Sequence, residues 1–536
     1  MVKQNLIISC LILVVSIIAC KSIKHYQFRE QYLSHNELIH ISNDSIKKPY
    51  LKAHLKNGEV YILDDKWSLD TIQNIISGHG NHYDFTREIL QTGVLNIALD
   101  SVALFETNAK LKPKGSARMA AMAILTSMDL ALGIICLTVP KACFGSCPTF
   151  YLDQNSGERL ADAEAFSNAI SPSLEYGDID DLMYAIGGDT ILGITMKNEA
   201  LETHIVKKAN LSIIRKNKGQ EVFLSPDDKY YITSGANRLV GATGPEGDIS
   251  SSLMALDGIE RTSLADANSL VTDEEIFFEF ENLNLQADKG IKLSFRQTMM
   301  TTYCLYSAIG YMGDEVGDIF AKLETEKESV EKMNSIFYNA LGGIKIYVQE
   351  DDLSWKYQGE MYETGPIAFN HELLPLKNLK TKHKIKVKLA MNKGLWRLDD
   401  VSLLNIVQEA KPMSVLPYSL KKNKKIDTKS LDKITSNNNE YIVSMPGDEY
   451  YFSYLIPSCK HYEKYQVFLD TRGYYIEWMR DSWLKEKNLY ALKKMMDNPK
   501  AWLNEETSNY KIYEAKMEKQ FWDSKWTQNN KSYESL

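Results

Sequence analysis

Residues 141–151, KACFGSCPTFY, decide how this sequence divides into structural units. They follow a run of 21 small and apolar residues, 119–139, and the chain after them has the pattern of short strands. Cys143 and Cys147 lie four positions apart, with a glycine between them and a proline after them. That spacing predicts a tight corner at the entrance to a β-rich region.

A disulfide between Cys143 and Cys147 is the favoured interpretation of the corner. It would shape the corner more than stabilise the domain, because so short a loop contributes only about 2 kcal/mol in the chain-entropy model. The alternatives are buried thiols, pairing with Cys136, Cys304 or Cys459, or a redox-active or metal-binding pair. Thioredoxin-type pairs have two intervening residues and no partner pair for zinc is present, so we expect no metal and no cofactor.

The run 119–139 is long enough to span a bilayer. Asp129 lies at its middle, however, and an aspartate at the bilayer centre costs roughly 2.5–3.5 kcal/mol on insertion scales. We therefore expect a buried helix of small residues that packs closely against its neighbours. A second membrane span is the alternative.

The N-terminus has the features of a bacterial lipoprotein signal. Lys3 precedes an apolar run, 6–18, and the sequence Ile-Ile-Ala-Cys ending at Cys20 resembles a lipobox. The resemblance implies removal of residues 1–20 and acylation of Cys20 by diacylglycerol and a fatty acid such as palmitate, which anchors the chain in a membrane. An ordinary secretory signal or a short membrane anchor is the alternative.

Residues 21–24 contain no aspartate or glutamate, so the sequence lacks an acidic surface-export tag. The predicted location is therefore the cell outer membrane, facing the periplasm, with the cell surface as the alternative. Disulfides are permitted in that compartment.

The chain of 536 residues is too long for one hydrophobic core, and its composition, 44% hydrophobic and 25% charged, is that of a globular protein. Its net charge of −8 argues against a general nucleic-acid binder, which needs a basic face. The predicted partners are the membrane, through the lipid anchor, and a glycan or an envelope protein.

The predicted fold class is α+β, multidomain and β-rich, with antiparallel sheets or a sandwich, a buried small-residue helix and C-terminal helices. The expected units are a signal peptide (1–20), a tether (21–48), a small β unit (49–110), a buried helix with the cysteine corner (111–151), a β-rich central domain ending in helices (152–342), a β-sandwich-like module (343–415), a linker (416–440), and C-terminal strands plus aromatic helices (441–536).

Alternation of apolar residues predicts half-buried strands in the second half of the chain. Ile276, Phe278 and Phe280 alternate in this way, as do apolar residues at 344–348 and 385–389. Trp355 and Trp396 belong to the same region and are interpreted as core residues. The alternative makes them a candidate ligand platform, on which the apolar faces of sugar rings would stack.

Six motifs resemble a group of uncharacterised bacterial lipoproteins: KACFGSCPTFY (141–151), RTSLAD (261–266), TTYCLYSAIGYMG (301–313), ETGPIA (363–368), GLWRLD (394–399) and RGYYIEWMR (472–480). The resemblance spans most of the mature chain and implies no activity and no catalytic residues. Residues 343–410 are more weakly similar to galactose-binding-like sandwiches, a fold that includes glycan binders and spacers alike.

Three functions remain open at this stage. The first is a non-catalytic, lipid-anchored protein that binds a glycan or a protein at the envelope. The second is a secreted hydrolase with a carboxylate site, for which no GxSxG, HExxH or P-loop motif is present. Adjacent pairs such as Asp180 and Asp181 do not identify a catalytic pair, because glycosidase carboxylates come from separate elements. The third is a structural subunit of an envelope complex.

Overall fold

A computed structural model of the chain describes residues 30–32, 51–55, 59–64, 66–83, 89–107, 147–153, 161–198, 200, 202–325, 338–377, 379, 382–436, 440–445, 447–477 and 483–515. Four predictions lie outside these residues: the signal peptide, the acylated Cys20, the helix at 119–139, and the partner cysteine Cys143. None of the described helices is both long and apolar enough to cross a membrane.

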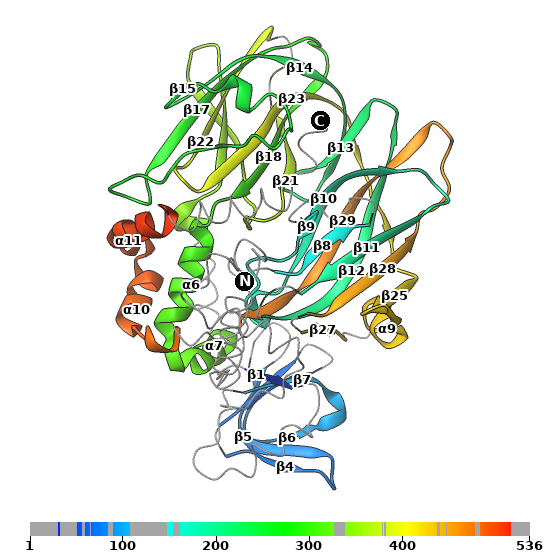
Figure 1. Ribbon diagram of the computed structural model, residues 1–536, viewed down its shortest axis with the longest axis vertical. Coiled ribbons are helices and arrows are strands. Elements are labelled where there is room, and N and C mark those ends of the chain that lie inside the picture. Colours follow the sequence, from blue (N-terminus) through cyan, green and yellow to red (C-terminus); the bar gives the residue numbers. More distant parts are fainter. Residues whose placement is uncertain are drawn as a thin grey trace, which may run out of the picture.

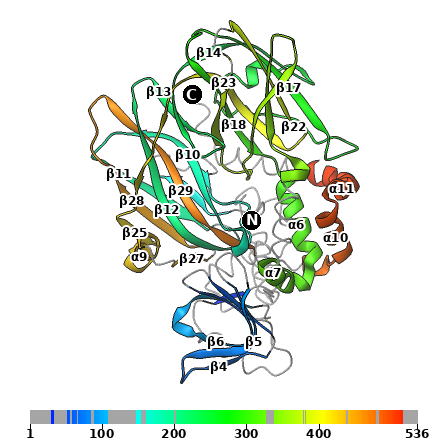
Figure 2. The same cartoon turned by 180° about the vertical axis from the view of Figure 1, so that it is seen from behind.

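The fold is α+β, multidomain and β-rich, as predicted. It comprises an N-terminal sheet, two larger β modules and a group of helices (Figure 1). In this view the N-terminal sheet lies at the bottom, the first module at the right and the second module at the top, while the helices stand at the left. The view from behind shows the same arrangement (Figure 2).

The N-terminal sheet agrees with the β unit predicted at 49–110, except that it also takes in a strand from the predicted tether. Its order is β1-β7-β2-β3-β5-β4, with β6 on β5. The strands are β1 (Glu30–Tyr32), β2 (Leu51–Leu55), β3 (Val60–Leu63), β4 (Ser68–Asp70), β5 (Ile75–Tyr83), β6 (Ile89–Ala98) and β7 (Val102–Thr107).

The first module consists of two antiparallel sheets that enclose one hydrophobic core. Their orders are β10-β29-β12-β24, with β27 on β12, and β26-β25-β28-β11-β8-β9. The strands are β8 (Thr149–Leu152), β9 (Ala163–Glu164), β10 (Tyr176–Ile186), β11 (Ile191–Lys197), β12 (Glu202–Asn217), β24 (Met413–Val415), β25 (Ser419–Lys422), β26 (Lys425–Ile426), β27 (Ile442–Ser444), β28 (Glu449–Leu455) and β29 (Glu463–Glu477).

Two predicted boundaries are wrong in this module. Strands from 441–477 do not form a C-terminal block of their own, because β29 lies between β10 and β12 along most of its length. The predicted linker at 416–440 is folded, since β25, β26 and helix α9 (Thr428–Thr435) lie within it. Asp427 caps α9 by accepting a hydrogen bond from the Ser430 amide at 3.0 Å, and Leu420 and Ile434 are buried in the core.

The second module is an eleven-stranded sheet among the described residues, and it folds back on itself because the long strand β14 pairs with β13, β17 and β23. The strands are β13 (Gln220–Leu224), β14 (Tyr230–Gly244), β15 (Gly247–Asp248), β16 (Arg261–Thr262), β17 (Asp273–Glu281), β18 (Asp288–Gln297), β19 (Ile344–Gln349), β20 (Trp355–Met361), β21 (Asn370–Leu376), β22 (Lys384–Asn392) and β23 (Trp396–Ala410).

The predicted alternation is confirmed here, while the predicted module boundary is wrong. Ile276, Phe278 and Phe280 are buried, as expected of strand β17. Residues 343–415 do not form a sandwich of their own, because β22 pairs with β17 and β23 pairs with β18. The unit extends over 220–410, with helices α6 (Met300–Met312) and α7 (Val316–Thr325) inserted between β18 and β19.

The helices pack against the core of the second module. Helices α6 (Met300–Met312) and α7 (Val316–Thr325) lie at the end of the central domain, where helices were predicted. The C-terminal pair, α10 (Leu489–Asp497) and α11 (Pro499–Tyr513), is divided at Pro499, which occupies the first turn of α11. Short 3₁₀ turns occur at Leu99–Ser101, Pro172–Leu174, Ser250–Ser252, Gly313–Glu315 and Trp483–Lys485.

Candidate functional site

A pocket of ≈210 Å³ lies where the first module, the second module and α6 meet. Cys147, at the end of the KACFGSCPTFY corner, belongs to its wall, as do Gly365 and Pro366 from the loop between β20 and β21. Pockets between domains that combine apolar walls with a few converging polar groups are the default ligand sites of proteins. We therefore take this pocket as the candidate site.

The lining is acidic and aromatic. Its carboxylates and tyrosines are Glu164, Glu202, Glu477, Tyr306, Tyr338, Tyr362 and Tyr475. No lysine, arginine or histidine is among the described residues that line it. The pocket thus offers hydrogen-bond acceptors, negative charge and ring faces together.

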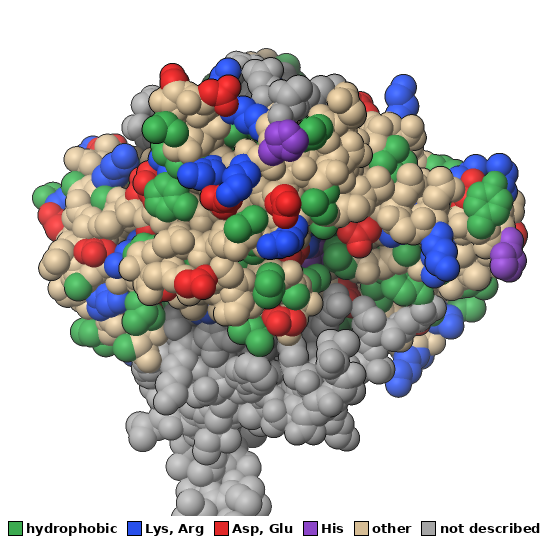
Figure 3. Space-filling view, turned by 90° about the horizontal axis from the view of Figure 1, so that it is seen from above, with side chains coloured by type: hydrophobic (Ala, Val, Ile, Leu, Met, Phe, Trp, Pro, Cys, Tyr) green, Lys and Arg blue, Asp and Glu red, His purple; other side chains and the backbone are tan. Residues whose placement is uncertain are grey.

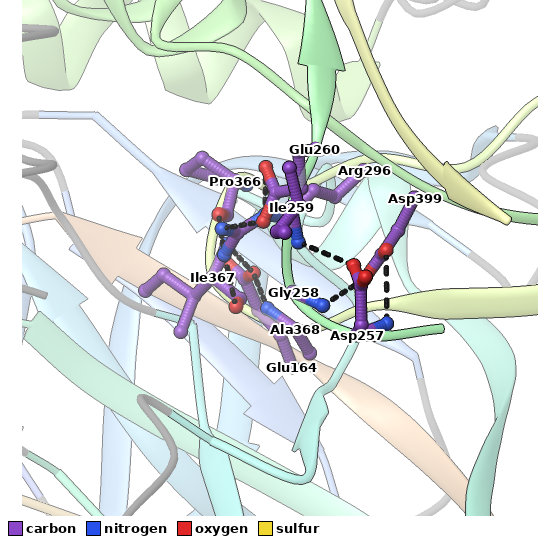
Figure 4. A network of polar contacts seen from close by, with 10 residues as sticks. All are labelled: Glu164, Asp257, Gly258, Ile259, Glu260, Arg296, Pro366, Ile367, Ala368 and Asp399. Atoms are coloured by element: carbon purple, nitrogen blue, oxygen red, sulfur yellow. Dashed lines mark hydrogen bonds and ion pairs between the residues drawn. The ribbon is translucent and has the colours of Figure 1, made fainter. Parts of the chain in front are cut away.

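Glu164, the last residue of β9, fixes one wall of the pocket. Its Oε2 accepts hydrogen bonds from the amides of Ile367 at 2.9 Å and Ala368 at 3.3 Å (Figure 4). Gly365 lies beside the same carboxylate with φ +117°, and a Cβ there would come within 2.5 Å of Glu164 Oε2. Glycine is therefore required at this point of the ETGPIA motif, for its backbone conformation and for the close approach.

Arg296, at the end of β18, holds the same loop from the other side. Its Nη1 donates to the carbonyl oxygens of Pro366 at 3.1 Å and Ile367 at 3.0 Å (Figure 4). The guanidinium is buried, pairs with the buried carboxylate of Glu260, and stacks on the ring of Phe369 at 4.7 Å. Glu164 of the first module thus binds two amides of the loop, and Arg296 of the second module binds two of its carbonyls.

The segment that carries Glu260 is fixed by Asp399. The Asp399 carboxylate accepts hydrogen bonds from the amides of Asp257 at 3.3 Å and Gly258 at 3.0 Å (Figure 4). Burial raises the pKa of Asp399 to about 6. The carboxylate therefore positions the partner of Arg296 and lies outside the lining of the pocket.

Cys147 is buried and forms no disulfide with another described cysteine; its Sγ lies 3.7 Å from Oε1 of Glu164. As a thiol it has a raised pKa, first because of burial and then because of the charges of Glu164 and Glu202, which makes it a poor nucleophile. The three described cysteines, Cys147, Cys304 and Cys459, are all free, so they do not pair with one another. A bridge from Cys147 to Cys143 stays a prediction.

Gln297 is the pocket residue with an unused donor. Its side chain is 1% exposed, and its Oε1 accepts a hydrogen bond from Thr301 Oγ1 at 2.6 Å. Its Nε2 has no hydrogen-bond partner in the described part of the chain. A buried amide without an acceptor is costly, and an acceptor atom on a bound ligand would relieve that cost.

The first module also contributes Glu202 and Tyr475 to the lining of the pocket. Glu202 at the start of β12 pairs with Nε2 of the buried His204 at 3.0 Å. The ring of His204 meets the ring of Tyr475 edge-on, and the Tyr475 hydroxyl donates to the carbonyl of Ser167 at 3.0 Å. These side chains lie on neighbouring strands, because β12 pairs with β29. No spacing in the sequence connects them.

The two tryptophans interpreted as core residues, with a ligand platform as the alternative, lie in different environments. Trp396 is 1% exposed and meets Phe295 and Tyr362 edge to face, at centroid distances of 5.7 and 6.2 Å. The platform alternative is therefore wrong for Trp396, and the core interpretation is confirmed. Trp355 is half-buried on the outer face of the second module.

A second group of carboxyls is buried where β10 and β21 approach each other. Burial raises the pKa of Asp178 to about 6, of Asp181 to about 7 and of Glu372 to about 8, and it raises the pKa of Asp180 as well. Asp180 Oδ2, Asp181 Oδ2 and Glu372 Oε2 have no hydrogen-bond partners within the described residues. The folded protein therefore holds protons here that exposed carboxyls would lose.

These raised pKa values predict that stability falls as pH rises. Between the ordinary carboxyl pKa of about 4 and the folded values of about 6 to 8, the folded state binds more protons than the unfolded state. The contribution of these protonated carboxyls to the free energy of unfolding is thus complete below about pH 4 and is lost by about pH 8. The unfolding midpoint in urea, measured from pH 5 to 8, should fall in the wild type.

Asp181→Asn should flatten this pH profile and raise the free energy of unfolding at pH 8 by about 1–2 kcal/mol, because the amide cannot ionise. Asp351→Asn, at a carboxylate with a side chain 95% exposed, is the matched control and should leave the profile unchanged. A wild-type profile that rises with pH would contradict the assignment.

No group of three or more histidine, cysteine, aspartate or glutamate side chains is placed to hold a metal ion in the part of the chain that the structure describes.

Comparison with known proteins identifies no family. No protein-family model matches the chain, and no curated protein matches its sequence. Among solved structures, the chain is weakly similar to the crystal structure of BuGH86wt in complex with neoagarooctaose, with a TM-score of 0.16 and 8% identity. The similarity covers 42% of this chain and 34% of that one, so the chain matches only about a third of that protein. A likeness at this level relates neither the folds nor the functions.

Proposed function

We propose that the protein is a lipid-anchored protein of the bacterial cell envelope that binds the end of an uncharged or amino-bearing glycan in the pocket between its modules. The observation that carries the proposal is the lining: three carboxylates and four tyrosine rings surround ≈210 Å³, with no basic side chain among the described lining residues.

The chemistry of the walls matches that class of ligand. Carboxylates accept hydrogen bonds from hydroxyls or ammonium groups, and such charge-assisted bonds are the stronger kind. Tyrosine rings offer apolar faces for the C–H faces of a sugar ring, and a cation near a ring face is attracted as well. Gln297 Nε2 supplies a donor for a hydroxyl or carbonyl oxygen of the ligand.

Size and charge restrict the ligand further. The pocket is smaller than the roughly 300–1,000 Å³ typical of sites for drug-sized molecules, so it suits a small molecule or the end of a chain. Acidic sugars and phosphates would face three glutamates, and no lysine, arginine or histidine among the described lining residues would offset that like charge, which is costly to bury. The proposal therefore excludes sulfated, uronic and phosphorylated ends.

The anchoring half of the proposal rests on the lipobox-like sequence that ends at Cys20. Acyl chains on Cys20 would hold the protein at the outer membrane, where envelope glycans are available as ligands. Metabolic labelling with an alkyne-bearing palmitate tests this half separately: we expect the label on the wild type and its absence from Cys20→Ser. Equal labelling of both chains would refute the anchor.

The pocket is tested by calorimetric titration of the mature chain, residues 21–536, with neutral, amino-bearing and acidic oligosaccharides. We expect binding of the neutral or amino-bearing compounds, weakened about three- to tenfold in Gln297→Leu, because one hydrogen bond is worth about 0.5–1.5 kcal/mol. Gln408→Leu, at an exposed glutamine on β23, is the matched control. Preference for acidic compounds, or equal affinity in Gln297→Leu, would refute the proposal.

A hydrolase is the second candidate, favoured by one observation. Glu164, Glu202 and Glu477 line one pocket and come from three different strands, as the two carboxyls of a glycosidase do. In that case the wild type should release reducing ends from a bound oligosaccharide. Glu202→Gln or Glu477→Gln should abolish release while binding persists.

A further inference from the structure

Aromatic side chains form a row across the outer face of the second module, separate from the pocket. Four neighbouring strands contribute to it, in the spatial order β17, β22, β19 and β20. The members are Phe277 on β17, Lys388 on β22, Tyr347 on β19, and Trp355 with Tyr357 on β20. Phe277 is opposite Lys388, Lys388 is opposite Tyr347, and Tyr347 is opposite Tyr357.

The rings contact one another along this aromatic row. The centroid of Phe277 lies 5.6 Å from that of Trp355, and the centroids of Tyr347 and Tyr357 are 5.5 Å apart. Lys388 joins the two pairs, with its Nζ 4.7 Å from the centroid of Tyr347 and 5.5 Å from that of Trp355. These contacts hold the rings in place, so little conformational entropy remains to be lost when a ligand binds.

The row belongs to the solvent face of the sheet. Directly opposite residues in a sheet point to the same side, and residues one position along the strand point to the other. Ile276, Ile346 and Val387, each next to a member of the row, are fully buried in the core. Phe277 is 38% exposed and Tyr357 53% exposed, so the row is open to solvent.

Charges of both signs flank the rings. Lys388 pairs with Glu275 at 2.7 Å, and Lys384 pairs with Glu279 at 2.7 Å, both on this outer face. The face of the molecule seen from above likewise intersperses acidic, basic and apolar side chains without a broad area of one sign (Figure 3). A surface that is locally neutral, with donors and acceptors beside ring faces, complements an uncharged partner that carries many hydroxyls.

A protein partner fits this row less well. Stable protein interfaces bury about 800 Å² on each partner, with an apolar centre depleted of charge. Here a strip only one ring wide is bordered by Lys–Glu pairs that would have to be desolvated. A polyanion would need a basic stripe free of acidic neighbours. The outer lysines of β22, at 384, 386 and 388, instead lie beside β17, where Glu281 is opposite Lys384, Glu279 is opposite Lys386, and Glu279 and Glu275 pair with Lys384 and Lys388.

We infer that the aromatic row is a docking site for the chain of an uncharged polysaccharide, which stacks its sugar rings on Trp355, Tyr357 and Phe277. The ring centroids within each pair lie 5.5–5.6 Å apart, and Lys388 connects the two pairs, so the row can contact more than one sugar unit. β20 begins at Trp355 and ends at Met361, beside the pocket residue Tyr362. At about 3.3 Å per residue the row and the pocket are about 20 Å apart along this strand.

The inference stands independently of the proposal for the pocket. The row would contact the middle of a polysaccharide chain, and the pocket would bind a small ligand or the end of such a chain. Binding at one site therefore does not require binding at the other. Their predictions differ accordingly: binding at the row strengthens with chain length, whereas binding at the pocket does not.

The test is affinity electrophoresis of the mature chain in gels containing cellulose-derived, β-1,3-glucan or mannan polysaccharide, followed by titration with oligosaccharides of two to six units from whichever gel retards it. Trp355→Ala/Tyr357→Ala should weaken binding of the longest oligosaccharide at least tenfold and abolish the gain with length. Tyr418→Ala/Tyr490→Ala, at tyrosines exposed elsewhere, is the matched control and should bind as the wild type does.

Three outcomes would overturn the inference: no retardation by any of the neutral gels, equal affinity in the Trp355→Ala/Tyr357→Ala variant, or stronger retardation in a gel of acidic polysaccharide. Gln297→Leu distinguishes the aromatic row from the pocket. In this variant, affinity at the row should still rise with oligosaccharide length, while affinity for the pocket's ligand should fall. Circular dichroism of each variant shows whether the fold is retained.

Discussion

Trp396→Ala should lower the free energy of unfolding by about 3–5 kcal/mol, the range observed when a large aromatic core residue is truncated. The indole is 1% exposed and packs edge to face with Phe295 and Tyr362, so alanine leaves a cavity that the sheet cannot close. Its Nε1 has no acceptor in the described residues, and loss of that unpaired donor offsets part of the cost. Urea unfolding followed by tryptophan fluorescence and far-UV circular dichroism measures the difference.

Trp355→Ala is the matched control. The ring of Trp355 is half-buried and contacts Phe277 and Lys388 on the outer face, so its removal should cost about 1 kcal/mol or less. Comparing the two variants thus distinguishes a core tryptophan from a surface tryptophan within the same module. Equal destabilisation by the two variants would contradict the assignment of Trp396 to the core and Trp355 to the surface.

Arg296→Met should destabilise the protein by about 3–5 kcal/mol, because it breaks a buried ion pair and leaves one charge behind. The guanidinium pairs with Glu260 and donates to the carbonyls of Pro366 and Ile367. Without it the carbonyls of Pro366 and Ile367 lose their donor, and the loop that forms the pocket wall is held by its bonds to Glu164, to Ser167 and to the Gln297 amide. We therefore expect weaker ligand binding together with a lower unfolding midpoint in urea.

Arg238→Met is the control for this change. Arg238 is also a strand residue of the second module, but its pair with Glu281 is exposed and 3.7 Å long, so it should contribute about 1 kcal/mol or less. Adding Glu260→Gln to Arg296→Met removes the uncompensated charge and should recover part of the loss. If the double variant is no more stable than Arg296→Met, the cost does not arise from the Glu260 charge.

Local features of the fold could be predicted from the sequence. Alternation identified β17, β19 and β22, because each has one face in the core and one in solvent. Helices at the end of the central domain and at the C-terminus were expected as well, and α6 and α11 lie there. These signals act within a few residues, so no knowledge of the rest of the chain is needed.

Boundaries between units could not be predicted, because they depend on which strands pair. β29 pairs with β10 and β12, and nothing in its own pattern identifies partners so distant in the sequence. The segment 416–440 was interpreted as a linker because lysines and asparagines dominate it. Asp427 and Ser430 form a helix-start signal in that segment. Leu431 and Ile434 occupy the apolar positions that follow, and the two signals together predict α9.

The candidate site was beyond prediction for the same reason. Glu164, Glu202 and Glu477 lie on three strands, and Gln297 precedes α6, so only the assembled modules bring them together. Two motifs did point toward the pocket without revealing it. Cys147 of the corner and Gly365 of ETGPIA both line it, and the glycine is there because Glu164 leaves no room for a side chain.

The position of β29 has a consequence for how the protein is made. β10 and β12 leave the ribosome long before β29, the strand that must lie between them. At roughly 5–20 residues per second, the 250 or so residues between β12 and β29 take about 12–50 s to synthesise. Throughout that interval the edges of β10 and β12 that face β29 are open, and exposed strand edges invite aggregation. The first module therefore cannot complete its β10-β29-β12 order until the last strand has been synthesised.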